Sequence, residues 1–193
     1  IKSDILGFFK GFPENVDKTA PHGVRPDVMK TYVRSCAGYC VITYILGVGD
    51  RHFDNILLRR TGHLFHVDFG FIFGRDPKPM PPPMKITSQM INGMGGPQSA
   101  NYRDFLELCC QAYNIIRQHA KLFLSLLDLM RDANIPDMAP DPDAKIAEVR
   151  EKFRLDLDDE AASREFLRIL DLSVAALFPH ISDFIHTIAT RLR

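Results

Sequence analysis

Residues 35–49, SCAGYCVITYILGVG, form an uncharged and largely apolar stretch in the N-terminal part of the chain. Its fifteen residues are fewer than the roughly 20 that a helix needs to cross a bilayer. We therefore expect a helix at the centre of a soluble fold, buried on all sides. Pro26 suits the first turn of this helix, and Gly47 suits its C-terminal end.

Apolar spacing elsewhere predicts a mainly helical chain with one small β-hairpin. Two short apolar runs, ILLRR and HLFHVDFG, flank Thr61 and Gly62, as in a hairpin. Asp141 and Asp158 suit the N-cap positions of two helices. Residues 75–85 contain five prolines in eleven positions and must form a loop. Helical patterns cover residues 3–12, 101–118, 120–135, 142–153, 158–178 and 179–193.

The composition is that of a globular domain. Hydrophobic residues make up 46% of the 193 positions, enough to bury a core in one domain or at most two small ones. Lys plus Arg and Asp plus Glu both number 24, so no overall field attracts nucleic acid and we expect no nucleic-acid partner. The four cysteines lack the paired C-x-x-C spacing of a zinc site, which indicates buried, reduced thiols in a cytosolic protein.

The string GVGDRHFDN, directly after the apolar stretch, has the spacing of a kinase catalytic loop. Protein kinases use an Asp at the substrate hydroxyl, an Asn five residues later for magnesium, and an Asp-Phe-Gly whose Asp also holds magnesium. Asp50 and Asn55 have this spacing, and Asp68 begins DFG thirteen residues after Asn55. The hairpin would return the second oxygen ligand beside the first. Its strands would present Leu57 and Val67 to an adenine ring.

The order of residues in this motif differs from that of protein kinases, in which histidine and arginine precede the Asp. Here DRH is followed by HVDFG, which resembles the phosphatidylinositol 3- and 4-kinase superfamily and its large protein-kinase relatives. The strings YILGVGDRHFDNILL, FHVDFGFIFGRDPKPMPPPMK and FRLDL narrow the resemblance to class III phosphatidylinositol 3-kinase, the endosomal and autophagic lipid kinase. The resemblance runs from about residue 28 to the C-terminus.

This resemblance implies a fold and a division of the chain. The fold is the C-lobe of a kinase: a helical bundle with a small β-hairpin that carries the catalytic and DFG loops. Residues 1–193 are expected to be this C-lobe without the N-lobe, and inactive alone, since no glycine-rich phosphate loop or N-lobe lysine is found. Residues 25–100 would hold the catalytic and activation loops, residues 101–178 the helical support, and residues 179–193 a C-terminal amphipathic helix.

In the catalytic loop, the resemblance places Asp50 and His52 beside the inositol hydroxyl. A histidine near its ordinary pKa can take a proton at neutral pH, and Asp50 can do so too, so the sequence leaves both as candidate bases. Arg51 is expected to tie the loop to the fold through its fork of donors. Asp54 is expected to be a solvated loop residue.

The resemblance also implies the cofactors, ATP and Mg²⁺, with Mn²⁺ as an alternative metal. Asn55 and Asp68 would be the metal ligands, because hard oxygen donors suit magnesium. Leu57 and Val67 would form the floor of the adenine pocket.

The proline-rich loop takes the position of the activation loop, which in these lipid kinases meets the lipid head group. It offers three cations, Arg75, Lys78 and Lys85, and Asp76 subtracts one charge. This modest charge suits phosphatidylinositol, whose head group bears only the phosphodiester. The loop therefore predicts phosphatidylinositol in membranes as the substrate.

The last fifteen residues carry an apolar stripe that includes Phe184, Ile185 and Ile188, and they end in the basic string TRLR. Such a helix can pack on its own domain or lie at an anionic membrane surface, and we expect both. The resemblance further implies a regulatory protein-kinase-like subunit, a Beclin-family subunit, and a cytoplasmic enzyme that is peripheral on endosomal and autophagic membranes.

Two other functions compete with a lipid kinase. A protein kinase of the related superfamily would share D-R-H-x-x-N and D-F-G, but the string RDPKPMPPPMK argues against it. A non-enzymatic module with a kinase shape would be expected to lose Asp50, Asn55 or Asp68, and all three are present.

Overall fold

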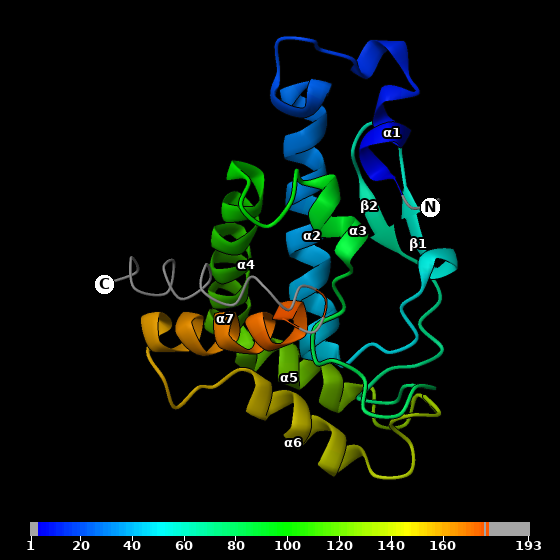
Figure 1. The fold of residues 1–193 in the computed structure, drawn as a ribbon. Helices are drawn as coiled ribbons and strands as arrows, with labels where there is room; N and C mark the ends of the chain where they lie inside the picture. The colour runs from blue at the N-terminus through cyan, green and yellow to red at the C-terminus, as the bar shows by residue number, and fades with distance from the viewer. Residues whose placement is uncertain (1–3, 176, 178–193) are drawn as a thin grey trace.

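A computed structural model describes residues 4–175 and 177 of the chain and confirms a mainly helical fold with one hairpin. Within these residues, a two-stranded sheet packs beside a set of helices arranged around α2 (Figure 1). Residues 179–193, including the predicted membrane contacts Phe184, Ile185 and Ile188, lie outside the described part. The elements are α1 (Ile5–Lys10), η1 (Pro13–Asn15), η2 (Pro21–Gly23), α2 (Pro26–Leu46), η3 (Phe53–Asn55), β1 (Ile56–Leu58), β2 (Leu64–His66), α3 (Ser88–Gly93), α4 (Ala100–Gln118), α5 (Ala120–Leu129), α6 (Pro142–Lys152) and α7 (Asp159–Ala175).

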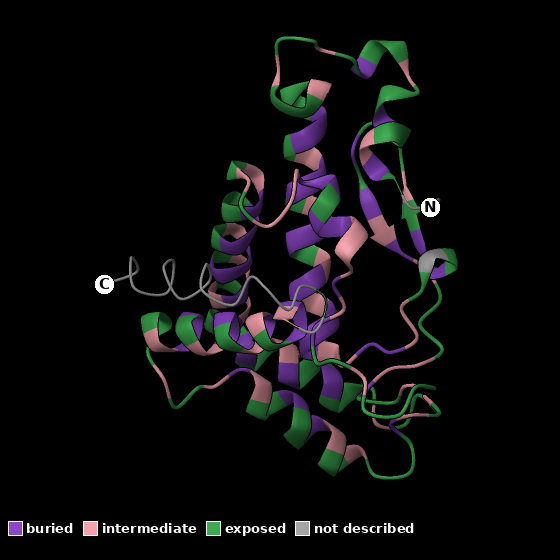
Figure 2. Cartoon of the chain, viewed as in Figure 1, coloured by how far each residue is buried: buried purple, intermediate pink, exposed green. Residues whose placement is uncertain are grey.

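Helix α2 is the centre of the fold, and it packs against α4, α6 and β2 (Figure 1). Pro26 occupies its first turn and Gly47 ends it with φ 59°, as predicted. The prediction of burial on all sides is wrong for one side. Gly38 is exposed and Tyr39 and Ile42 are only partly buried. Figure 2 shows exposed and intermediate segments on α2 among the buried ones.

The hairpin is pinned to α2 at two points. Strands β1 and β2 are antiparallel, with Leu57 opposite Phe65. The Ser35 hydroxyl of α2 accepts a hydrogen bond from the Leu64 N–H at 2.9 Å. In the connecting turn, Gly62 has φ 92°, and a Cβ there would lie 2.2 Å from a carbonyl oxygen of α2. The chain can therefore approach α2 this closely only with glycine at that position.

Helices α4 to α7 form the support beneath α2. Tyr44, Tyr113 and Phe166 from three helices pack ring against ring, with centroids 4.6–6.4 Å apart. The carboxylates of Asp141 and Asp158 accept hydrogen bonds from N–H groups three residues later, which confirms both predicted N-caps. None of the helices in the described residues is long and apolar enough to span a membrane.

Two helix predictions needed correction. Helix α5 ends at Leu129 and not at residue 135; Asn134 takes φ 52°, and Pro136 disfavours helix at the residue before it. Helix α3 was not predicted, because six residues are too few to show a helical period. Tertiary contacts hold it: the Tyr32 hydroxyl of α2 donates to the Met90 carbonyl at 3.0 Å.

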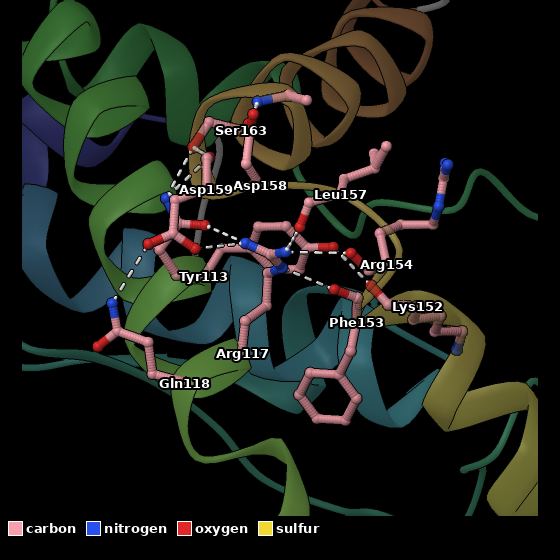
Figure 3. A network of polar contacts seen from close by, with 12 residues as sticks. Tyr113, Arg117, Gln118, Lys152, Phe153, Arg154, Leu157, Asp158, Asp159 and Ser163 are labelled. Carbon is pink, nitrogen blue, oxygen red and sulfur yellow. Dashed lines mark hydrogen bonds and ion pairs between the residues drawn. The ribbon is translucent and has the colours of Figure 1, made fainter.

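The connection between α6 and α7 is organised by one buried arginine (Figure 3). Arg117 of α4 is 7% exposed. Its guanidinium donates to the carbonyls of Phe153 at 2.7 Å, Arg154 at 3.0 Å and Leu157 at 2.5 Å. It also pairs with the Asp159 carboxylate at 2.6 Å. The string FRLDL is thus the segment that wraps this guanidinium.

Candidate active site

The polar loop after α2 and the segment that follows DFG lie side by side and are joined by backbone hydrogen bonds. The Gly49 N–H donates to the Phe71 carbonyl, and the Gly74 N–H to the Gly47 carbonyl, both at 2.9 Å. A Cβ on Gly49 would lie 2.1 Å from the Arg75 carbonyl oxygen. The two loops therefore converge, as the sequence predicted, and glycine permits the close approach.

Arg51 fastens the two loops together. Its guanidinium donates to the carbonyls of Gly49 at 2.7 Å and Val67 at 2.9 Å, and also to the carbonyl of Asp68. Partial burial lowers the pKa of Arg51 from its ordinary value, while the carboxylates of Asp68 and Asp50 act in the opposite direction. These contacts confirm the predicted structural role of Arg51.

Asp50 and His52 face each other in the polar loop. The Asp50 carboxylate lies 3.7 Å from His52 Nε2, and the two side chains are 23% and 45% exposed. Asp50 has φ 49°, an uncommon conformation for a residue with a side chain. Both groups are open to solvent and close enough to contact one substrate hydroxyl. The Asp54 side chain is 97% exposed, as expected for a solvated residue.

Asn55 and Asp68 are brought together by the hairpin. The Val67 N–H donates to the Asn55 carbonyl at 2.9 Å, so Asp68 follows directly beside Asn55. Asn55 is 7% exposed, and its Nδ2 donates to the Asp50 carbonyl at 2.7 Å, which leaves its Oδ1 as a ligand atom. Asp68 Oδ1 accepts from the Gly70 N–H at 3.0 Å, which leaves Oδ2.

Two such oxygen donors fit magnesium. This ion is commonly bound through one or two protein oxygens, with water and phosphate completing its shell. The described residues contain no group of three or more His, Cys, Asp or Glu side chains arranged to hold a metal ion.

The outer face of the hairpin presents the predicted apolar pair. Leu57 is 43% exposed, and alternation along β2 puts Phe65 and Val67 on the same face as Leu57. Phe65 was not predicted, although its spacing of two residues from Val67 marks it as a member of this face. The face is apolar and open, as an adenine-contacting surface requires, and the adenine role itself stays a prediction.

The three cations of the proline-rich loop differ in their surroundings. Arg75 pairs with Asp137 at 2.7 Å and Lys85 with Asp76 at 3.0 Å, and both carboxylates are 6% exposed. Lys78 is exposed and is the one of the three that makes no ion pair within the described residues. Two of the three predicted head-group contacts are thus engaged inside the fold.

Sequence reasoning missed the two acids that hold this loop. Asp137 accepts from the Ile72 N–H at 3.0 Å, and no local signal marks a partner 65 positions away in sequence. Asp76 Oδ1 accepts from the Lys78 N–H at 2.9 Å, and the string DPK is a recognisable signal for such a turn.

His66 is a third residue that was missed. It is 4% exposed and stacks on Tyr39 with ring centroids 4.8 Å apart. Neither of its ring nitrogens has a hydrogen-bond partner among residues 4–175 and 177. Burial, together with the nearby Arg51 charge, lowers the pKa of His66 to about 4. His66 is therefore neutral at physiological pH.

Comparison with known proteins finds phosphatidylinositol kinases both among family models and among individual relatives. Residues 4–139 match the family described as "Phosphatidylinositol 3- and 4-kinase". The chain is 55% identical over 182 residues to "Phosphatidylinositol 3-kinase, root isoform" of Glycine max, covering 94% of the chain and 22% of the relative. It is 53% identical over 170 residues to "Phosphatidylinositol 3-kinase VPS34" of Arabidopsis thaliana (88% and 21%), and 49% identical over 186 residues to the protein of that name in Saccharomyces cerevisiae (96% and 21%).

The chain therefore spans about a fifth of the length of the curated relatives it matches. These relatives confirm the resemblance to class III phosphatidylinositol 3-kinases. With a family match over most of its residues and the paired loops that Arg51 joins, the chain belongs to the phosphatidylinositol 3- and 4-kinase family.

Proposed function

We propose that the full-length protein transfers the γ-phosphoryl group of ATP to the 3-hydroxyl of phosphatidylinositol, giving phosphatidylinositol 3-phosphate. One observation carries this proposal: Arg51 and backbone hydrogen bonds join the polar loop to the DFG segment. That junction brings together Asp50, Asn55 and Asp68, which in this proposal supply the proton acceptor and the two cation ligands that phosphoryl transfer requires. The names of the relatives support the lipid substrate.

In this proposal Asn55 and Asp68 hold Mg²⁺, or Mn²⁺, through Oδ1 of the amide and Oδ2 of the carboxylate. The bound metal offsets the charge of the triphosphate. Leu57 and Val67 contact the adenine from the open face of the hairpin. Pairing of β1 with β2 keeps these two groups of residues at a fixed separation.

The proton of the inositol hydroxyl passes to Asp50 or His52. If His52 accepts the proton, the Asp50 carboxylate at 3.7 Å stabilises the imidazolium that forms; if Asp50 accepts it, the carboxyl group becomes neutral. The Asn55 amide contributes indirectly, because it holds the Asp50 carbonyl at 2.7 Å. Both candidates stay open, since the two side chains lie 3.7 Å apart and neither is buried.

In this proposal the proline-rich loop meets the head group through the exposed Lys78, while its other two predicted contacts, Arg75 and Lys85, are engaged by Asp137 and Asp76. Its low free charge suits phosphatidylinositol, whose head group carries only the phosphodiester. We further propose that the enzyme acts in endosomal trafficking and autophagy. It would work as a peripheral protein on endosomal and autophagic membranes, with a protein-kinase-like and a Beclin-family regulatory subunit. Phe184, Ile185 and Ile188 would contact the lipid surface.

A lipid-kinase assay of the full-length protein tests the proposal. Vesicles containing phosphatidylinositol, with ATP and Mg²⁺, should yield phosphatidylinositol 3-phosphate, and Asp68→Ala should lower the rate by about 1,000-fold or more because a metal ligand is lost. Asp54→Ala is the matched control, an exposed acid of the same loop, and should retain activity. Wild-type protein that phosphorylates peptides but not lipid would contradict the proposed substrate, and an active Asp68→Ala would contradict the metal assignment.

A further inference from the structure

The side chain of Asp76 lies between the proline-rich loop and the polar loop, and it is 6% exposed. Its Oδ2 accepts hydrogen bonds from the Asp50 N–H at 3.2 Å and from Lys85 Nζ at 3.0 Å. Its Oδ1 accepts from the Lys78 N–H at 2.9 Å. One carboxylate therefore connects both ends of the proline-rich loop to the backbone of a candidate base.

The ion pair with Lys85 closes the proline-rich loop into a ring. Lys85 Nζ also donates to the Pro82 carbonyl at 3.1 Å, and its side chain is 11% exposed. Prolines have no N–H group and cannot be fixed by ordinary backbone hydrogen bonds. A buried ion pair across the ends of the loop replaces those bonds.

The Asp76 carboxylate also constrains Asp50. Asp50 sits at φ 49°, a left-handed conformation that costs about 1–2 kcal/mol for a residue with a Cβ. Such a conformation persists only where neighbouring groups enforce it. Asp76 holds the N–H of Asp50, and Asn55 Nδ2 holds its carbonyl at 2.7 Å. With both peptide groups fixed, the direction of the Asp50 Cα–Cβ bond is fixed as well.

We propose that Asp76, in its ion pair with Lys85, is a positioning residue that aims Asp50 at the substrate hydroxyl. The proline-rich loop then acts on the chemical step in addition to any contact with the head group. This inference rests on the proposed lipid-kinase function. Burial raises the pKa of Asp76, but the Lys78 N–H and the Lys85 ammonium together lower it by more. The pKa therefore lies below its ordinary value, and the carboxylate stays charged.

Steady-state kinetics of the full-length protein on phosphatidylinositol vesicles test the inference. Asp76→Ala should lower kcat about 30-fold and leave KM for ATP and for lipid within about twofold, because only the geometry of the chemical step is disturbed. Asp137→Ala is the matched control. Asp137 is an equally buried acid paired with Arg75, but it makes no hydrogen bond to Asp50, and its loss should change kcat less than about threefold.

Lys85→Met separates positioning from head-group binding. If Lys85 acts through Asp76, kcat falls, KM for lipid is unchanged, and the double variant Asp76→Ala/Lys85→Met is no worse than Asp76→Ala alone. A raised KM for lipid with unchanged kcat would make Lys85 a head-group contact and would contradict the positioning role of the Asp76–Lys85 pair.

A charge swap, Asp76→Lys with Lys85→Asp, distinguishes the Asp50 hydrogen bond from ring closure. The swapped pair can close the ring, but an ammonium group at position 76 cannot accept the Asp50 N–H. In the swapped variant, residues 75–85 should be as resistant to protease as in wild type, and more resistant than in Asp76→Ala, while kcat stays low. Recovery of kcat with the swap would show that ring closure alone suffices and would overturn the inference.

The outcomes also separate this inference from the proposed function. Wild-type protein without lipid-kinase activity contradicts the proposed function. Active wild type with an equally active Asp76→Ala contradicts only the positioning role. If Asp76→Ala does not fold, Asp76→Asn keeps an oxygen acceptor but loses the charge of the pair, and it should show a smaller fall in kcat with the same unchanged KM values.

Discussion

Arg51 and Arg117 use their guanidinium groups in the same way in two different parts of the molecule. Each donates to three backbone carbonyls: Arg117 to carbonyls 36–40 positions away, and Arg51 to Gly49 in its own loop and to Val67 and Asp68 across the hairpin. Arg117 is 7% exposed and holds the connection between α6 and α7. Arg51 is only partly buried and holds a junction that includes Asp50 and Asp68, both at positive φ.

The difference separates support from function. Around Arg117 the arginine satisfies buried carbonyls, so its main contribution is to the free energy of unfolding. Around Arg51 the joined segments carry the catalytic candidates, and the arginine lies between Asp50 and Asp68, both at positive φ. Arg154 in the Arg117 segment also has a positive φ of 45°, so the difference between the two sites lies in the residues held and not in backbone strain. The same side chain is expected to affect stability in one place and rate in the other.

The largest expected effect is on stability, at Arg117. Replacing it by Met leaves the carbonyls of Phe153, Arg154 and Leu157 without their donor, which we expect to lower the free energy of unfolding by about 4 kcal/mol. Hydrogen exchange of the α4 and α7 amides in the full-length protein measures the loss. Arg168→Met removes an exposed pair on α7 and should change exchange little; similar effects of the two substitutions would contradict the assigned role of Arg117.

The next largest effect is a dependence of stability on pH through His66, which lies near Arg51. The pKa of His66 is lowered to about 4, below its unfolded value of about 6.5. Between pH 6.5 and pH 4 the unfolded state binds a proton at this histidine and the folded state does not. The contribution of His66 to the free energy of unfolding is therefore complete above pH 6.5 and is lost as the pH falls toward 4, by on the order of 3 kcal/mol. His66→Phe should remove this dependence.

Hydrogen exchange of the β1 and β2 amides, taken as a ratio of wild type to His66→Phe at each pH, measures the effect. Taking the ratio cancels the intrinsic dependence of exchange on pH. A ratio that stays constant from pH 7 to pH 4.5 would show that burial of the neutral imidazole contributes nothing to the stability of the hairpin.

A smaller effect is expected at the entry to the polar loop. Gly47 has φ 59°, and a Cβ there would lie 2.6 Å from the Gly74 backbone nitrogen. Gly47→Ala should therefore cost about 2 kcal/mol and lower kcat, since both loops must shift. Gly38→Ala is the control: no atom lies within 4 Å of its added Cβ, and in mid-helix it should stabilise by about 0.5–1 kcal/mol. The free energy of unfolding and kcat are measured for both variants, and a Gly47→Ala variant as stable and active as Gly38→Ala would contradict the close approach at Gly47.

Much of the fold could be predicted because its signals are local. The uncharged stretch, the turn at Thr61 and Gly62, and the Asp caps each depend on neighbours within a few residues. The open stripe at Gly38 and the short helix α3 depend instead on which elements pack against α2. Such tertiary contacts leave no period in the sequence.

In the candidate site, too, local signals could be predicted and tertiary contacts could not. Asp50, Asn55 and Asp68 were predicted because a shared spacing marks them, and their roles in catalysis and metal binding stay predictions. The ion pairs of Asp76 and Asp137 were missed because their partners are fixed only by the folded chain. The cations Arg75 and Lys85 consequently looked free when counted in sequence, although both are engaged by buried carboxylates.

The most direct test of the account replaces both arginines in the same way. In full-length protein, Arg51→Lys and Arg117→Lys each reduce a fork of donors to one ammonium group that cannot reach three carbonyls. On the same preparations, kcat on phosphatidylinositol and hydrogen exchange of the α4 amides are measured. We predict that Arg51→Lys lowers kcat about 30-fold with α4 protection unchanged, and that Arg117→Lys lowers protection while the folded fraction keeps its kcat. Parallel losses of rate and protection in both variants would contradict the division between a supporting and a functional arginine.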